Sequence, residues 1–321
     1  MTQKCLFFID DVIWTFRDLA RKQPDSLFDS PFLAVLKEAW EKYGFKTQLN
    51  LFYSTDNYYG NDDFNLSEMP DRYKAEWEAS SNWLKLAFHA RQEFPDYPYV
   101  NASYEQVRED FLKIKEEVLR FAGEKSFTDS IVPHWLPMSY EGCCALRDLG
   151  IKTISTTYGV RSEYNGDPNS LPYGHAGRLL YHRKPETMVF TRDTNATEIE
   201  KSICGYNHVD DVAAYDAIYT KTSGIKDEKT GLVFKRPTNG ICLNLLEQDA
   251  LEQALDERIG KKWEFIGVAN HEQYFYEEYM FCQPDYAKKS YTPQSGFTTQ
   301  DMNVFLSKIC VTNKSKLFGT N

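Results

Sequence analysis

The sequence predicts an α/β fold: a single (β/α) barrel of seven or eight mostly parallel strands, with a hairpin-like insert in the middle. Short apolar runs alternate with segments of helical spacing over residues 4–157, and parallel neighbouring strands need long connections of this kind. The alternation is less regular beyond residue 157. No repeat or linker-like stretch divides the 321 residues. We therefore expect one domain over residues 1–321, with a doubly wound sheet as the alternative architecture.

Five strand–helix units are predicted in the first half of the chain. The predicted strands span residues 4–9, 45–53, 83–89, 130–134 and 151–157. The helix ends between them carry the usual signals, serine at the start (Ser30, Ser67, Ser103 and Ser139) and glycine at the end (Gly44, Gly123 and Gly150). Serine oxygens accept the first free N–H groups of a helix, and glycine adopts the left-handed conformation that ends one.

The second half is less regular. Residues 158–185 are rich in Gly, Pro, Asn and Tyr and predict the irregular insert. Beyond it, the patterns predict strands at 188–192, 215–220 and 263–269, helices at 195–204, 247–259 and 299–311, and a hairpin over 232–245. A C-terminal helix and tail occupy about 298–321.

Charge and cysteine content limit the classes of partner. The net charge is −10, from 47 acidic and 37 basic residues, so no nucleic acid and no anionic membrane surface is expected as the main partner. Seven cysteines without a CxxC motif argue against a zinc knuckle or a redox motif. The N-terminus does not resemble a signal peptide, and no apolar run has spanning length. These features predict a cytoplasmic protein with reduced thiols.

Polar residues follow several of the predicted strands at their carboxyl ends, where parallel β/α folds build their sites. Asp10 and Asp11 end the first strand, His89 and His134 end two others, and His271 follows the last. Carboxylates and imidazoles are ligands for zinc and similar ions. Adjacent carboxylates repel each other unless a cation is present. The sequence therefore predicts a divalent metal ion, zinc or a similar transition metal, with an acid–base pair beside it.

Four segments also resemble motifs of the polysaccharide deacetylase (NodB-like) superfamily. "FFIDDV" is similar to the first motif, in which a strand ends in Thr-Phe-Asp-Asp, and residues 89–93 are similar to the second, with Glu93 where the family has a second His. Residues 132–155 resemble the third motif region, but the family's Arg-x-Pro-Tyr-Gly is not reproduced. "FIGVANHEQYF" is similar to the last motif, in which a strand ends in His followed by an acidic residue.

This resemblance implies a β/α barrel and a metal-dependent hydrolase that removes an acetyl or similar acyl group from a sugar. Asp10 would be the base that activates water, and His271 would protonate the leaving group. The implied metal ligands are Asp11, His89, the substituted Glu93 and, if Glu93 points away, His134. The implied partner is a small carbohydrate or sugar conjugate.

Residues next to these positions are candidates for substrate binding. Trp14, Trp135 and Tyr274 would stack against sugar rings, and Arg91 would hold a hydroxyl or carboxylate. Glu272 adjoins His271 and would tune it or contact the substrate.

Two other functions remain open at the level of the sequence. A glycoside hydrolase on the same barrel would use two carboxylates, for example Asp10 or Asp11 with Glu93 or Glu272, and their separation would decide that mechanism. A non-catalytic sugar-binding relative is the second alternative, supported by Glu93 and the missing third motif. Each residue also has a purely structural interpretation, such as Asp10-Asp11 as a helix cap or His89 as a core histidine.

Overall fold

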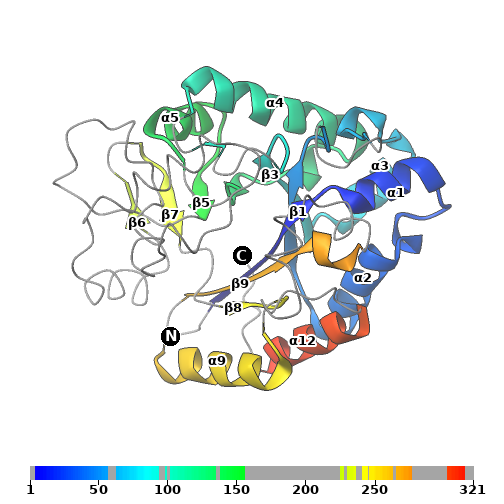
Figure 1. Cartoon of the computed structure of the whole chain (residues 1–321), viewed down its shortest axis with the longest axis vertical. Helices are drawn as coiled ribbons and strands as arrows, with labels where there is room; N and C mark the ends of the chain where they lie inside the picture. The colour runs from blue at the N-terminus through cyan, green and yellow to red at the C-terminus, as the bar shows by residue number, and fades with distance from the viewer. Residues whose placement is uncertain are drawn as a thin grey trace, which may run out of the picture.

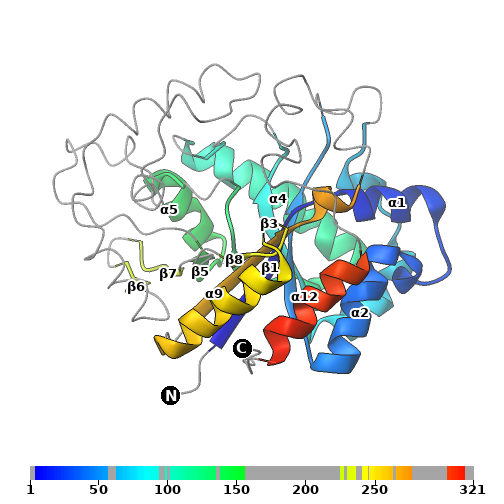
Figure 2. The same ribbon diagram turned by 60° about the horizontal axis from the view of Figure 1, so that its bottom comes forward.

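Parallel strands alternate with helices along most of the described chain. Figure 1 shows the computed structural model, which describes residues 4–56, 63–93, 98–99, 102–134, 138–155, 225–227, 230–235, 241–244, 246–262, 265–276 and 302–314. Most of the strands lie inside an arc of helices (Figures 1 and 2). This is the layered arrangement in which parallel sheets are buried.

The first sheet has five strands in the order β3-β2-β1-β9-β8. Its strands are β1 (Lys4–Val12), β2 (Thr47–Phe52), β3 (Leu84–Ala90), β8 (Ile241–Cys242) and β9 (Phe265–His271). Every neighbouring pair in it is parallel. The first strand of the chain is therefore central, with the last strand beside it.

The second sheet has four strands in the order β4-β5-β7-β6. These are β4 (Ser130–Ile131), β5 (Thr153–Ser155), β6 (Ile225–Lys226) and β7 (Val233–Lys235). β4, β5 and β7 are parallel, while β6 is antiparallel to β7.

The two sheets adjoin at β3 and the segment around β4. Leu86 forms an isolated parallel bridge with Phe127, and the main-chain N–H of His134 donates to the carbonyl of His89 at 3.2 Å. The predicted α/β class with parallel strands is confirmed. Among the described strand pairings, none joins β8 to the four-stranded sheet, so closure into a barrel stays a prediction.

Seven helices are described outside the sheets: α1 (Trp14–Lys22), α2 (Pro31–Tyr43), α3 (Lys74–Ser80), α4 (Tyr104–Phe121), α5 (Tyr140–Asp148), α9 (Gln248–Gly260) and α12 (Met302–Lys314). Short 3₁₀ turns lie at Leu27–Asp29, Leu66–Glu68, Asp71–Tyr73, Glu124–Ser126 and Glu272–Phe275. α12 packs between α2 and α9, as Figure 2 shows. Buried aromatic rings fix this layer, including Phe32 of α2 stacked on Phe305 of α12 with ring centroids 6.3 Å apart.

Several helix signals act as predicted. Ser103 and Ser139 accept hydrogen bonds from the main-chain N–H groups of Gln106 and Gly142 at 3.1 and 2.9 Å. Gly44 ends α2 in the left-handed conformation, with φ of 67°, and donates to the carbonyl of Trp40. These local signals are reliable because they depend only on residues within one helical turn.

The structure corrects two predictions and adds one helix. The helix expected from Ser67 begins at Lys74, because Pro70 disfavours helical conformation at the residue before it. The hairpin expected over 232–245 is wrong, since β7 and β8 belong to different sheets and β7 pairs with β6 instead. Helix α1, which directly follows β1, was not predicted.

The predicted insert at 158–185 and the elements expected at 188–192, 195–204 and 215–220 lie outside the described residues. No helix in the described part of the chain is long and apolar enough to cross a membrane.

Candidate metal centre

The carboxyl ends of four parallel strands bring the predicted residues together. Asp10 and Asp11 lie near the end of β1, His89 near the end of β3, and His271 at the end of β9, while His134 follows β4. In the ladder between β1 and β9, Asp10 is paired directly with His271. Parallel strands end at one edge of a sheet, so residues far apart in sequence become neighbours there.

Irregularities in two strands place the candidate ligands. Between Ile9 and Val12, β1 has one residue more than the facing part of β2. Asp11 lies within this bulge with φ of 61°, a left-handed conformation that costs free energy for a non-glycine residue. In β3, the register with β2 shifts between Phe88 and Ala90, so the extra residue there is His89. Bulges redirect side chains that regular alternation would send elsewhere.

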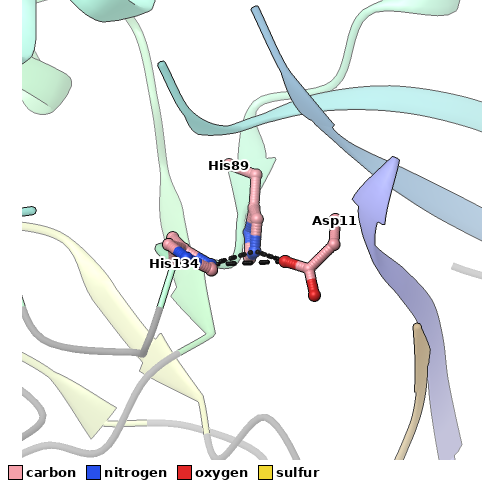
Figure 3. Close-up of side chains that lie close together, drawn as sticks. All are labelled: Asp11, His89 and His134. Carbon is pink, nitrogen blue, oxygen red and sulfur yellow. Dashed lines mark hydrogen bonds and ion pairs between the residues drawn. The ribbon is translucent and has the colours of Figure 1, made fainter. Parts of the chain in front are cut away.

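Three buried side chains meet at this point, as Figure 3 shows. Asp11 Oδ1 lies 3.1 Å from His89 Nε2 and 3.3 Å from His134 Nδ1. The two ring nitrogens are 3.2 Å apart. Asp11, His89 and His134 are 5%, 2% and 5% exposed, so water does little to screen them from one another. The described residues contain no other group of three or more His, Cys, Asp or Glu side chains arranged to hold a metal ion.

Main-chain acceptors behind the imidazoles set their tautomers. His89 Nδ1 donates to the carbonyl of Val132 at 2.5 Å, and His134 Nε2 donates to the carbonyl of Glu93 at 3.0 Å. In neutral imidazoles, the opposite nitrogens then carry lone pairs, and both face Asp11 Oδ1. Three lone pairs within 3.3 Å repel one another unless a cation lies between them. Histidine ligands typically donate their second N–H to a carbonyl in this way.

The residues fit a transition metal ion. Ligands about 2.0–2.1 Å from zinc in tetrahedral geometry are about 3.3–3.4 Å apart, close to the separations observed here. Two imidazoles and one carboxylate are also a donor set that several divalent transition metals accept. Three protein ligands leave a coordination position for water or substrate.

Electrostatics keep Asp11 ionised. Burial by itself would raise the pKa of Asp11, but in the metal-free protein the His134 and His89 imidazoles, when protonated, donate hydrogen bonds to its carboxylate and hold the pKa well below its ordinary value. A permanently ionised carboxylate is what a metal ligand requires.

Asp10 lies beside the cluster. Its Oδ1 is 3.9 Å from His89 Nδ1 and accepts a hydrogen bond from Asn50 Nδ2 at 2.6 Å. Burial raises the pKa of Asp10 to about 7; the positive potential of His89 opposes this rise, whereas Asp11 adds to it. Asp10 is therefore a carboxyl group that can change protonation state near neutral pH.

A pair of buried amides supports Asp10 from β2. Gln48 Nε2 donates to Asn50 Oδ1 at 2.6 Å, which turns the Asn50 amide nitrogen toward Asp10. Sequence analysis missed both residues. The signal was present, because Gln48 and Asn50 alternate with Leu49 and Leu51 and so share one face of the strand.

His271 has its own supporting contacts. Its Nδ1 donates to Asn244 Oδ1 at 2.9 Å, and the Cys242 thiol donates to the same oxygen at 2.8 Å. Burial lowers the pKa of His271, while the nearby Asp11 raises it. Nε2 therefore carries the lone pair and can take up or release a proton. Asn244 was also missed, because it lies in a segment interpreted as a hairpin.

Glu93 contributes to the site through its main chain. Its carbonyl orients His134, and its buried carboxylate is not part of the three-residue group. Phe52 packs against both imidazoles, with ring centroids 4.9 Å from His134 and 5.4 Å from His89. In this arrangement, His134 holds the position that the sequence resemblance gave to Glu93.

The predicted substrate-binding residues are not brought together in the same way. Trp14 is 1% exposed, and Arg17 stacks on its ring at 4.4 Å. Arg91 is exposed, with its main-chain N–H bonded to the Tyr99 hydroxyl. Trp135 and the side chain of Tyr274 lie outside the described part of the structure. Their sugar contacts stay predictions.

Glu272 is fully buried and lies at the N-terminus of α1. Its Oε2 accepts the main-chain N–H groups of Ile13 and Trp14 at 2.8 and 2.9 Å, and its Oε1 accepts that of Thr15 at 2.8 Å. Burial raises the pKa of Glu272 to about 7, and the hydrogen bonds from Thr15 and the helix N-terminus limit this rise. This placement favours a structural role over direct contact with substrate.

The raised pKa of Glu272 predicts a pH-dependent stability. The folded state holds the proton more tightly than the unfolded state, whose pKa is near 4.5. The corresponding stabilisation is present below pH 4.5 and is lost as pH rises to about 7, by at most about 1.4 kcal/mol per pH unit. Urea unfolding of metal-free wild type and Glu272→Gln at pH 5 and 8 should show a larger loss in wild type, because Asp10 contributes its own loss over this range in both proteins. A stability difference between the two proteins that does not change with pH would contradict it.

No family model matches the chain, and no curated protein matches it in sequence. Among solved structures, it is similar to a 4-alpha-glucanotransferase from Thermococcus litoralis, with a TM-score of 0.47 and 10% identity over 96% of this chain and 40% of that one. A CE4 family pseudoenzyme from Bacillus anthracis gives a TM-score of 0.32 and 10% identity over 84% of this chain and 64% of that one. A candidate polysaccharide deacetylase from Mycobacterium smegmatis gives a TM-score of 0.37 and 10% identity over 100% of this chain and 93% of that one. The chain thus spans less than half the length of the glucanotransferase, and similarities this distant do not assign it to a family.

Proposed function

We propose that the chain is a metal-dependent hydrolase that removes an acetyl or similar acyl group from a small sugar or sugar conjugate. The observation that carries the proposal is the convergence of three buried lone pairs, from Asp11, His89 and His134, beside a second carboxylate. The carbohydrate part rests on the resemblance of the strand-end motifs. A cytoplasmic location and zinc as the metal belong to the same proposal.

Asp11, His89 and His134 would hold the ion. When bound, it supplies positive charge that polarises an acyl carbonyl and makes a nearby water more acidic. Asp10 takes the proton of the attacking water, and Asn50 keeps its carboxylate in place. His271, in its protonated form, gives the Nε2 proton to the departing sugar nitrogen or oxygen, while its Nδ1–H stays bonded to Asn244.

The test is acyl release from defined substrates. Protein stripped with chelator and reloaded with zinc, cobalt, nickel or manganese is incubated with N- and O-acetylated sugars and sugar conjugates, and acetate is measured. We expect release that depends on the metal and is lost in Asp11→Asn. Metal uptake without acyl release from any of these substrates would contradict the hydrolase function and leave a metal site of another purpose.

A further inference from the structure

Helix α1 begins without a cap of its own. The residue at its N-cap position is Ile13, whose side chain has no polar atom. The first N–H groups of a helix nevertheless need acceptors when they are buried. Glu272 supplies them from the other end of the chain, 259 residues away from Ile13, through the three hydrogen bonds described above. The Thr15 hydroxyl and the Tyr276 hydroxyl, 2.9 Å apart, form a second link between the same two segments.

Both ends of this connection are next to the candidate site. Ile13 follows the left-handed Asp11 by two residues, and Glu272 follows His271 directly. A non-glycine residue stays in a costly main-chain conformation only where the surrounding structure holds it there. The Glu272 carboxylate fixes the chain immediately after the bulge, and it does so from the strand that carries His271.

We propose that Glu272 is a positioning residue: it holds the Asp10–Asp11 bulge in the metal-binding conformation and keeps His271 in register with it. This inference rests on the proposed metal site and goes beyond it, because no ligand atom comes from Glu272. It also replaces the expectation that Glu272 contacts substrate.

Glu76 provides a matched control. Its carboxylate likewise accepts from a distant helix start, from the Ser26 hydroxyl at 2.6 Å and the Leu27 main-chain N–H at 3.1 Å. These contacts join α3 to a 3₁₀ turn and involve none of the ligand strands. Loss of the Glu76 carboxylate therefore reports the general effect of removing a long-range helix cap.

The experiment compares cobalt binding by wild type, Glu272→Ala, Glu272→Gln and Glu76→Gln, using calorimetry and the visible absorption of the bound ion. We expect Glu272→Ala to bind about 10- to 100-fold more weakly, the usual effect of losing a group that supports a ligand, with an altered cobalt spectrum. Glu272→Gln should have an intermediate cobalt affinity. Its amide oxygen can still accept the N–H groups of Ile13 and Trp14, whereas its NH₂ group faces the Thr15 N–H and cannot accept from it. Glu76→Gln should bind within about two-fold of wild type.

The outcomes separate this inference from the proposed function. Wild-type affinity and spectrum in Glu272→Ala would overturn the inference and leave the metal site standing. If Glu272→Ala does not fold, the same criterion applies to Glu272→Gln, which retains part of the cap: wild-type cobalt affinity and spectrum in Glu272→Gln would overturn the inference. Equal weakening in Glu272→Gln and Glu76→Gln would also overturn it, since the effect would then be general destabilisation. A wild-type protein that binds no cobalt would refute the proposed function itself.

Discussion

Zinc or cobalt added to the metal-free protein is expected to bind one equivalent per chain and to raise its melting temperature. Asp11→Asn, His89→Gln and His134→Gln should each weaken binding by more than about 100-fold, because each removes one of three ligands whose supporting groups alone are worth 10- to 100-fold. At a metal concentration of about 100 times the dissociation constant, the stabilisation is about 2.7 kcal/mol. Metal analysis after gel filtration and thermal scans with and without chelator measure both effects.

Glu93→Gln is the variant that distinguishes the two ligand assignments. The structure predicts that it keeps the metal, because Glu93 orients His134 through its main-chain carbonyl. Loss of metal in Glu93→Gln together with retention in His134→Gln would show that the sequence resemblance assigned the third ligand correctly and that the cluster in Figure 3 is not the metal site.

Asp10→Asn is expected to separate catalysis from metal binding. Removal of a general base typically lowers a rate by about 10²- to 10⁴-fold, whereas the three ligands are untouched. The asparagine oxygen can still accept from Asn50 Nδ2, so the local packing should persist. The measurements are acetate release and cobalt affinity on the same preparations.

Asp129→Asn is a suitable control for Asp10→Asn, since Asp129 is a partly exposed carboxylate paired with Lys152. It should leave both acetate release and cobalt affinity unchanged. An Asp10→Asn protein that releases acetate at the wild-type rate would remove Asp10 from the mechanism. One that loses the metal would make Asp10 a ligand instead.

The sequence identified the strands and the residues at their ends for a simple reason. Burial on both faces gives parallel strands continuous apolar runs, and a polar residue that ends such a run is easily seen. Asp10, Asp11 and His89 follow directly from this pattern. His271 lies beside Asp10 because β1 and β9 are parallel and adjacent, and such strands end at the same edge of a sheet.

The local geometry of the site could not be predicted in the same way. An extra residue in a strand leaves no mark in an alternating pattern when both faces are buried, so the bulges at Asp11 and His89 were invisible. The choice between Glu93 and His134 depends on where a loop after β3 passes the segment after β4. The role of Glu272 depends on a contact between the two ends of the chain, which no local pattern encodes.

The cluster of Asp11, His89 and His134 lies at the junction between the two sheets and draws its side chains from both. Asp11 and His89 belong to the five-stranded sheet, whereas His134 follows the first strand of the four-stranded sheet. The strands of that second sheet are only two or three residues long as described, so it depends on its neighbour for stability. A cation held by all three side chains would cross-link the halves at their seam and make them unfold as one cooperative unit. Release of the ion would then uncouple them, and the smaller sheet would open first.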